Sequence, residues 1–125
     1  MFKFEELDIW KESINYASRI YKITESFPAE EKFGLVTQLR NAVISISLNI
    51  AEGSGRYHNK DFIRFLQIAI SSLYEVVSGL FIAKNERYIN DNDFKSAYSE
   101  AEKIAKMINA FISYLKKNHR QSTID

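Results

Sequence analysis

The stretch from Glu52 to Arg56 combines residue types that can bind phosphate, with two glycines around a serine and an arginine after them. Glycine-rich loops can hold phosphate on backbone N–H groups, but such loops follow a β-strand, and the Walker type carries a lysine before Ser or Thr. Here the loop follows a helical pattern and has no lysine. Glycine also tolerates the positive φ with which many helices end. We therefore expect Gly53 or Gly55 to cap a helix and form a turn.

Positive charges recur directly after this turn. Arg56, Lys60 and Arg64 are four residues apart, so they share one face at the start of the next helix. Tyr57, beside them, could stack on a nucleobase. This pattern favours a nucleic-acid-binding patch, although the same cations would also serve as solvated surface or complement a helix dipole. The candidate residues are Arg40, Arg56, Tyr57, Lys60, Arg64, Lys116, Lys117 and Arg120.

A second group of polar residues, which we name the polar seam, lies beside an apolar helix face. Its members are Gln38, Asn41, Ser45, Asn49, Glu52 and, on the following helix, Glu75. Buried polar groups need hydrogen-bond partners, so a network between the two helices is expected, with Arg40 as a candidate partner for Glu75. A ligand-binding seam and plain solvent exposure are the alternatives.

The residue patterns that are typical of catalysis or metal binding do not occur in the sequence. There is no cysteine, which excludes a disulfide or thiolate site and fits a reducing compartment. Neither His58 nor His119 has a glutamate three residues earlier, as a di-iron bundle requires, and no Gly-x-Ser-x-Gly nucleophile elbow is found. We expect no catalytic residue, no metal and no cofactor, and hence a protein that is not an enzyme.

Apolar residues recur with helical spacing in four segments, and no segment shows sustained alternation. The predicted helices span about residues 6–26, 29–52, 59–87 and 91–118, with Asn59 and Asn90 as N-cap candidates. Long helices with short connections favour antiparallel neighbours. The sequence therefore predicts an all-α, up-down-up-down antiparallel four-helix bundle that forms a single domain over residues 1–125.

Three of the four predicted helices carry more apolar surface than a simple bundle needs to bury. We expect the surplus to form an interface between copies of the chain, and its candidate residues are Ile9, Tyr16, Ile20, Ile44 and Leu48. Burying several such side chains at about 1.5–3 kcal/mol each would hold subunits together. The alternative is a monomer in which long aromatic side chains enlarge the core.

Composition limits the compartment and the partners. The net charge of the 125 residues is +1, so any binding to nucleic acid must come from a local patch. Acidic residues interrupt the N-terminal segment where a signal peptide needs an apolar core, and Arg64, Glu75 and Lys84 interrupt the most apolar region. We expect a cytoplasmic protein that does not bind a membrane.

The stretches FEELDIWKESINYASRIYKITESFPAEEKFGL, QLRNAVISISLNIAEGSGR and FIRFLQIAISSLYEV resemble the family of 23S ribosomal RNA intervening-sequence proteins, over about Phe4–Leu115. The family typically has Arg where this chain has Asn41, and Gly where it has Ser71. The resemblance implies an all-α bundle. It also implies a likeness to the accessory protein of diversity-generating retroelements, a ring-shaped pentamer that engages nucleic acid and a reverse transcriptase. The positions that match the family pattern are Gln38, Arg40, Asn49, Glu52, Gly53, Arg56 and Glu75.

These observations together predict a non-enzymatic homo-oligomer, with a cyclic pentamer favoured, that acts as an adaptor or associates with RNA or DNA. The alternative is a structural module that binds a protein partner through its apolar helix faces and does not contact nucleic acid.

Overall fold

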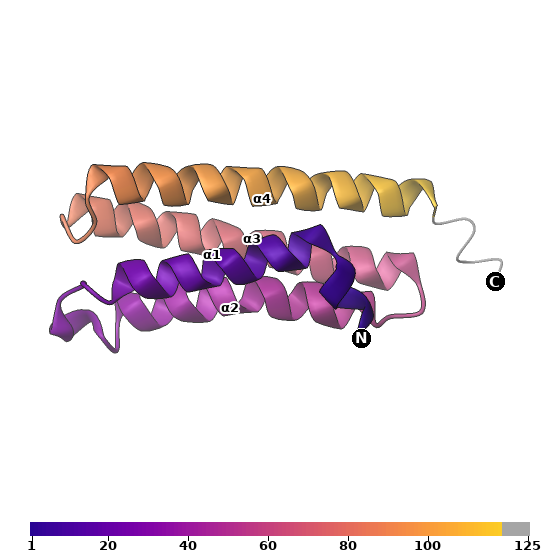
Figure 1. Ribbon diagram of the computed structural model, residues 1–125, viewed down its shortest axis with the longest axis horizontal. Helices are drawn as coiled ribbons and strands as arrows, with labels where there is room; N and C mark the ends of the chain where they lie inside the picture. The colour runs from indigo at the N-terminus through magenta and orange to yellow at the C-terminus, as the bar shows by residue number, and fades with distance from the viewer. Residues whose placement is uncertain (119–125) are drawn as a thin grey trace.

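The computed structural model describes residues 1–118, which form four α-helices and two short 3-10 helices. The α-helices are α1 (Asp8–Thr24), α2 (Leu35–Ser54), α3 (Asn59–Asn85) and α4 (Asp91–Lys117); η1 (Lys3–Glu6) precedes α1 and η2 (Ala29–Glu31) precedes α2. Consecutive helices run in opposite directions (Figure 1), and α1 and α3 each pack against both α2 and α4. The predicted antiparallel four-helix bundle is confirmed.

The second helix begins at Leu35, later than predicted, because the chain before it is not helical throughout. Gly34 has φ −113° and ψ −108°, outside the helical region. The Glu31 carboxylate accepts a hydrogen bond from the Leu35 N–H at 3.1 Å, so it satisfies one of the free donors at the helix start. Residues 29–31 therefore form the separate helix η2.

The N-cap prediction is right for the fourth helix and wrong for the third. The Asn90 side-chain oxygen accepts a hydrogen bond from the Asp93 N–H at 2.7 Å, as an N-cap residue does. His58, and not Asn59, is the N-cap of α3, without a side-chain cap bond. Asn59 instead donates its amide to the Leu115 carbonyl oxygen at 3.3 Å, which ties the start of α3 to the end of α4.

The core runs along the axis of the bundle and receives side chains from all four helices. The large side chains with less than 2% exposure are Tyr16, Ile20, Leu39, Val43, Ile46, Ile50, Leu66, Leu73, Val76, Leu80, Ile104 and Ile108. Two of them, Tyr16 and Ile20, were predicted from the sequence to lie between subunits, and Ile9 is buried as well. That prediction is wrong for these three residues.

The physical reason for this correction is that α1 has two apolar faces, and the core accepts only one of them. The Tyr16 hydroxyl donates to the Ala97 carbonyl oxygen on α4 at 3.0 Å, which turns the Tyr16 face inward. The other face stays at the surface, where Ile14 and Tyr21 are each 38% exposed. The apolar surface that α1 leaves exposed is therefore this second face.

Apolar side chains also remain exposed on α2 and α3. Leu48 on α2 is 61% exposed, and Ile44 is only partly buried against the core. On α3, the exposed apolar residues are Ile68, Tyr74, Phe81 and Ile82. The single bundle thus leaves apolar surface uncovered, although not at all of the predicted positions.

Helix α3 is long and apolar enough to cross a membrane by length and composition, and among residues 1–118 it is the one helix that is. The core helix of a water-soluble bundle meets the same criterion, and 39% of the apolar window is buried inside this bundle. The charged residue Glu75 lies within α3.

Candidate functional site

The turn between α2 and α3 is built by close packing and not by left-handed glycine. Gly55 is the C-cap residue of α2, which confirms the predicted cap, whereas Gly53 lies inside the helix. Gly55 has φ −87° and ψ −1°, and neither glycine has a positive φ, so the expected left-handed conformation is wrong. A Cβ atom on Gly53 would lie 2.7 Å from Phe62 Cδ1 and 2.8 Å from Phe65 Cβ on α3. Gly53 is therefore required because the two helices approach closely there.

This turn presents a group of cations and one aromatic ring, which we name the basic corner: Arg56, Tyr57, Lys60 and Arg64. The guanidinium groups of Arg56 and Arg64 lie 4.6 and 5.9 Å from the centre of the Phe65 ring. Both arginines also reach a carboxylate, but only at 3.9 Å and at exposed positions, where such pairs contribute little. The side chains of Arg56 and Arg64 can therefore exchange these carboxylates for a phosphate at a small cost in free energy.

Tyr57, the aromatic residue of the basic corner, is 96% exposed. It lies between two helices whose ends are fixed by backbone hydrogen bonds, such as that from the Arg56 N–H to the Gly53 carbonyl oxygen at 3.1 Å. A ring that is held in water on a fixed backbone loses little entropy when it stacks on a base.

The end of α4 lies near the basic corner, because the Asn59 side chain at the start of α3 is bonded to the Leu115 carbonyl oxygen. Lys116 and Lys117 in the last turn of α4 are both exposed. Arg120, the remaining candidate at this end, lies outside the described residues.

Arg40 does not belong to this patch. It lies in the first half of α2, whereas Arg56 follows the end of that helix, and its side chain is directed toward α1. Its Nε donates to Thr24 Oγ1 at 3.0 Å, one terminal nitrogen donates to the Tyr21 carbonyl oxygen at 3.2 Å, and the guanidinium lies 4.5 Å from the Tyr21 ring centre. Arg40 therefore makes these contacts with α1 and not the predicted ion pair with Glu75. The contacts connect α2 to the end of α1.

The polar seam forms a hydrogen-bond network between α2 and α3 at its centre. The Ser72 hydroxyl donates to Ser45 Oγ at 2.8 Å, and the Asn49 amide donates to the Ser45 carbonyl and hydroxyl oxygens at 2.8 and 3.0 Å. Ser72 is buried and small, and Gly79 lies two turns further along the same side of α3. Small residues thus let the two helices approach while their polar groups are satisfied.

The remaining seam residues are at the surface. Gln38, Asn41, Glu52 and Glu75 are exposed, and Glu52 pairs with Arg56. The expected network is therefore present only at Ser45 and Asn49. The outer part of the seam is solvent-exposed surface.

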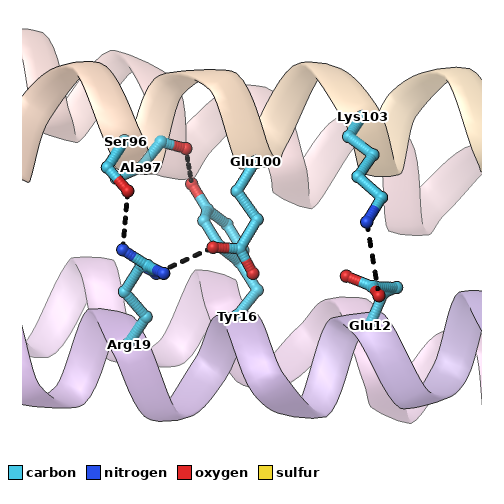
Figure 2. A network of polar contacts seen from close by, with 7 residues as sticks. All are labelled: Glu12, Tyr16, Arg19, Ser96, Ala97, Glu100 and Lys103. Carbon is cyan, nitrogen blue, oxygen red and sulfur yellow. Dashed lines mark hydrogen bonds and ion pairs between the residues drawn. The ribbon is translucent and has the colours of Figure 1, made fainter.

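A third polar group, which the sequence reasoning missed, joins α1 to α4 (Figure 2). Arg19 forms a 2.7 Å ion pair with Glu100 and donates to Ser96 Oγ at 2.6 Å, and Lys103 pairs with Glu12 at 3.5 Å. The spacing contained a signal: Glu12 and Arg19 are seven residues apart, and Glu100 and Lys103 are three apart, so each pair shares a helix face.

Burial sets the ionisation of two groups in this network. It raises the pKa of the Glu100 carboxyl above its usual range; Arg19 opposes this effect, and Glu12 adds to it. Burial likewise raises the pKa of the Tyr16 hydroxyl, which therefore remains a hydrogen-bond donor to α4. The network orients α1 on α4, and nothing in its geometry provides a nucleophile beside a base.

The described residues contain no group of three or more His, Cys, Asp or Glu side chains that could hold a metal ion. Fold and surface together define an all-α, antiparallel four-helix bundle protein with a basic corner at one end. The chain belongs to the 23S rRNA-intervening sequence protein family, whose model matches residues 5–110. The family resemblance that was noted from the sequence is confirmed.

A solved structure supports the same assignment. The chain is similar to a protein of unknown function from the S23 ribosomal protein family of Bacteroides thetaiotaomicron, with 25% sequence identity and a TM-score of 0.75. The match covers 83% of this chain and 97% of that one. A search of curated proteins found no match. The family and this relative indicate no enzymatic class.

Proposed function

We propose that this protein is a cytoplasmic, non-enzymatic homo-oligomer that binds RNA through the basic corner and serves as an adaptor. The observation that carries the proposal is that Arg56 and Arg64 both lie over the Phe65 ring, next to the turn that carries the exposed Tyr57. Lys60 is exposed in the first turn of the same helix. A charge of +1 gives the whole chain little attraction for RNA, so this local group must supply it.

Self-association would make a small patch effective. One chain presents only a few phosphate contacts, whereas a ring of subunits repeats them and raises the effective concentration of each. The apolar side chains that support association are exposed on α1, α2 and α3. They are Ile14 and Tyr21 on α1, Leu48 on α2, and Ile68 and Ile82 on α3. We favour a cyclic pentamer on the resemblance to the retroelement accessory protein.

RNA binding is tested by fluorescence anisotropy with a labelled single-stranded RNA over a range of salt concentrations. The test variant carries Arg56→Gln, Lys60→Gln and Arg64→Gln. The matched control carries Lys22→Gln, Lys95→Gln and Lys106→Gln, which removes the same charge from exposed positions outside the basic corner.

If the three cations contact phosphates, the test variant should lose at least about tenfold in affinity, and the slope of log affinity against log salt should fall by about 2. The control should retain most of its affinity and its slope. Equal losses in both variants would mean that only total charge matters, and the proposed site would be wrong.

Association is tested by light scattering coupled to chromatography. We expect a mass several times 14.5 kDa, and a smaller species when Leu48→Glu is introduced at an exposed apolar position of α2. A species of 14.5 kDa at micromolar concentration would exclude the ring.

The competing function, a module that binds only a protein partner, is favoured by the same exposed apolar surface. It predicts that neither triple variant changes RNA affinity, because the intact protein would not bind RNA measurably. The anisotropy experiment therefore distinguishes the two functions.

A further inference from the structure

A groove of about 420 Å³ lies between α3 and α4 (Figure 1 shows the two helices side by side), apart from the basic corner. Its floor is low because Ala101 and Ala105, one turn apart on α4, have short side chains. Its lining is mostly apolar, and three aromatic side chains and one carboxylate stand around it. This size and composition match those of small-molecule sites.

Two aromatic rings form a rigid wall of the groove. Phe81 on α3 and Tyr98 on α4 have ring centres 6.0 Å apart and planes at 85°, so they present faces in two directions. Phe94 packs against both rings, at 5.0 and 5.9 Å, and holds them in place. The third aromatic side chain, Tyr74, lies about two turns before Phe81 and is 69% exposed.

The same aromatic cluster already binds a cation of its own chain. The Lys84 amine lies 4.6 Å from the centre of the Phe94 ring, a distance at which the negative face of a ring attracts an ammonium group. Within residues 1–118, no cation lies over Phe81, Tyr98 or Tyr74. The three rings that line the groove therefore remain able to bind a cation on their faces.

A carboxylate completes the site. Glu102 lines the groove one turn after Tyr98, and no ion pair to it is found within the described part of the chain. Lys106, one further turn along α4, does not come within ion-pair distance of it. Aromatic faces beside an unpaired carboxylate attract a cation, and the alanine floor suits an apolar body.

We propose that this groove binds a small alkylammonium or quaternary ammonium compound. Its charged head lies against Phe81 and Tyr98 near Glu102, and its apolar part covers Ala101 and Ala105. The proposal does not depend on RNA binding, because the groove shares no residue with the basic corner. It also leaves free the exposed apolar residues that we assign to self-association, because none of them lines the groove.

The test uses the full-length protein and NMR titration with three probes: butyltrimethylammonium, choline and 3,3-dimethylbutan-1-ol, which is a neutral molecule of the shape of choline. The methyl signals of Ala101 and Ala105 report binding in the groove. We expect butyltrimethylammonium to bind most tightly and the neutral alcohol to bind about tenfold more weakly than choline.

Variants then separate charge from shape. Glu102→Gln should weaken butyltrimethylammonium binding about three- to tenfold, and Phe81→Leu should weaken it similarly while the groove stays apolar. The matched control is Glu75→Gln, which removes an exposed carboxylate from α3 outside the groove lining and should change nothing.

Three results would overturn the proposal: equal binding of choline and the neutral alcohol, equal effects of the two glutamate variants, or no shift of the alanine methyl signals. A groove covered by a neighbouring subunit would give this same last result and would equally overturn the proposal, because the site would then not be open to a ligand. The triple variant of the basic corner must bind butyltrimethylammonium as the unmodified protein does, so failure of RNA binding and failure of this site are recognised separately.

Discussion

Replacing Gly53 with alanine should destabilise the bundle, even though alanine is the better helix former. Alanine in a helix interior gains about 1 kcal/mol over glycine. Against this, the new Cβ would lie 2.7 Å from Phe62 Cδ1 and 2.8 Å from Phe65 Cβ. The Cβ atom of Phe65 cannot move without the α3 backbone, so the cost lies near the upper end of the roughly 1–3 kcal/mol that overpacking takes. The net loss is about 1–2 kcal/mol.

Gly55→Ala is the matched control, two residues further along the same turn. The nearest atom to its added Cβ is the Glu52 carbonyl oxygen at 3.6 Å, an ordinary contact, and its φ of −87° suits alanine. This change should stabilise the protein by about 0.4–1 kcal/mol, because alanine restricts the unfolded chain. The two variants should thus differ by about 2 kcal/mol, or about 1 M in the urea midpoint.

Gly79→Ala provides an intermediate case for the same urea experiment. Its Cβ would meet Leu39 Cδ2 at 2.6 Å and Leu39 Cγ at 3.2 Å, so this buried side chain must shift, but no backbone atom has to move with it. The cost of this contact should roughly cancel the gain in helix propensity. If Gly53→Ala unfolds at the same urea concentration as Gly55→Ala, the close approach of α2 and α3 at the turn is refuted.

Three further predictions concern contacts away from this turn. Arg40→Ala removes the hydrogen bonds and the ring contact to α1, so it should lower the free energy of urea unfolding by about 1–2 kcal/mol and leave RNA affinity unchanged. Asn90→Ala removes the cap of α4 and should lower the free energy of urea unfolding by about 1 kcal/mol. Asn92→Ala, within the first turn of the same helix, should change this free energy little. Glu100 has a folded pKa above its unfolded value of 4.5, so the folded state takes up its proton first and this group stabilises the fold as the pH falls toward 4.5. The unfolding free energy of the unmodified protein relative to Glu100→Gln should therefore increase from pH 7 to pH 5, and a decrease would contradict the burial of this carboxyl.

The architecture could be predicted from the sequence because it depends on local patterns. Four segments with helical periodicity, joined by short connections, allow few arrangements other than an antiparallel bundle. The cap at Asn90 could also be predicted, since it involves a residue only three positions away. The helical pattern predicts the start of α2 too early, because the backbone at Gly34 lies outside the helical region and the pattern of apolar residues does not show this.

The orientation of α1 could not be predicted from its own residues. The Ile20 face and the Tyr21 face are both apolar, and the choice between them depends on α4, which contacts Tyr16 and Arg19 from far along the chain. For the same reason Arg40 was assigned to the wrong neighbour. Its position on α2 allows contact with α1 or with α3, and its side chain donates to Thr24 Oγ1 and to the Tyr21 carbonyl oxygen at the end of α1.

The packing of α2 on α3 also explains why the basic corner is exposed. Gly53, Ser45 and Gly79 let the two helices approach closely, and the connection between them consists of only residues 55–58. A connection that short, between helices in contact, leaves no space inside for a large ring, so Tyr57 must point into water. The exposure of Tyr57 thus depends on the contact between α2 and α3 at their small residues. A substitution that separates these two helices should therefore also change the exposure of Tyr57.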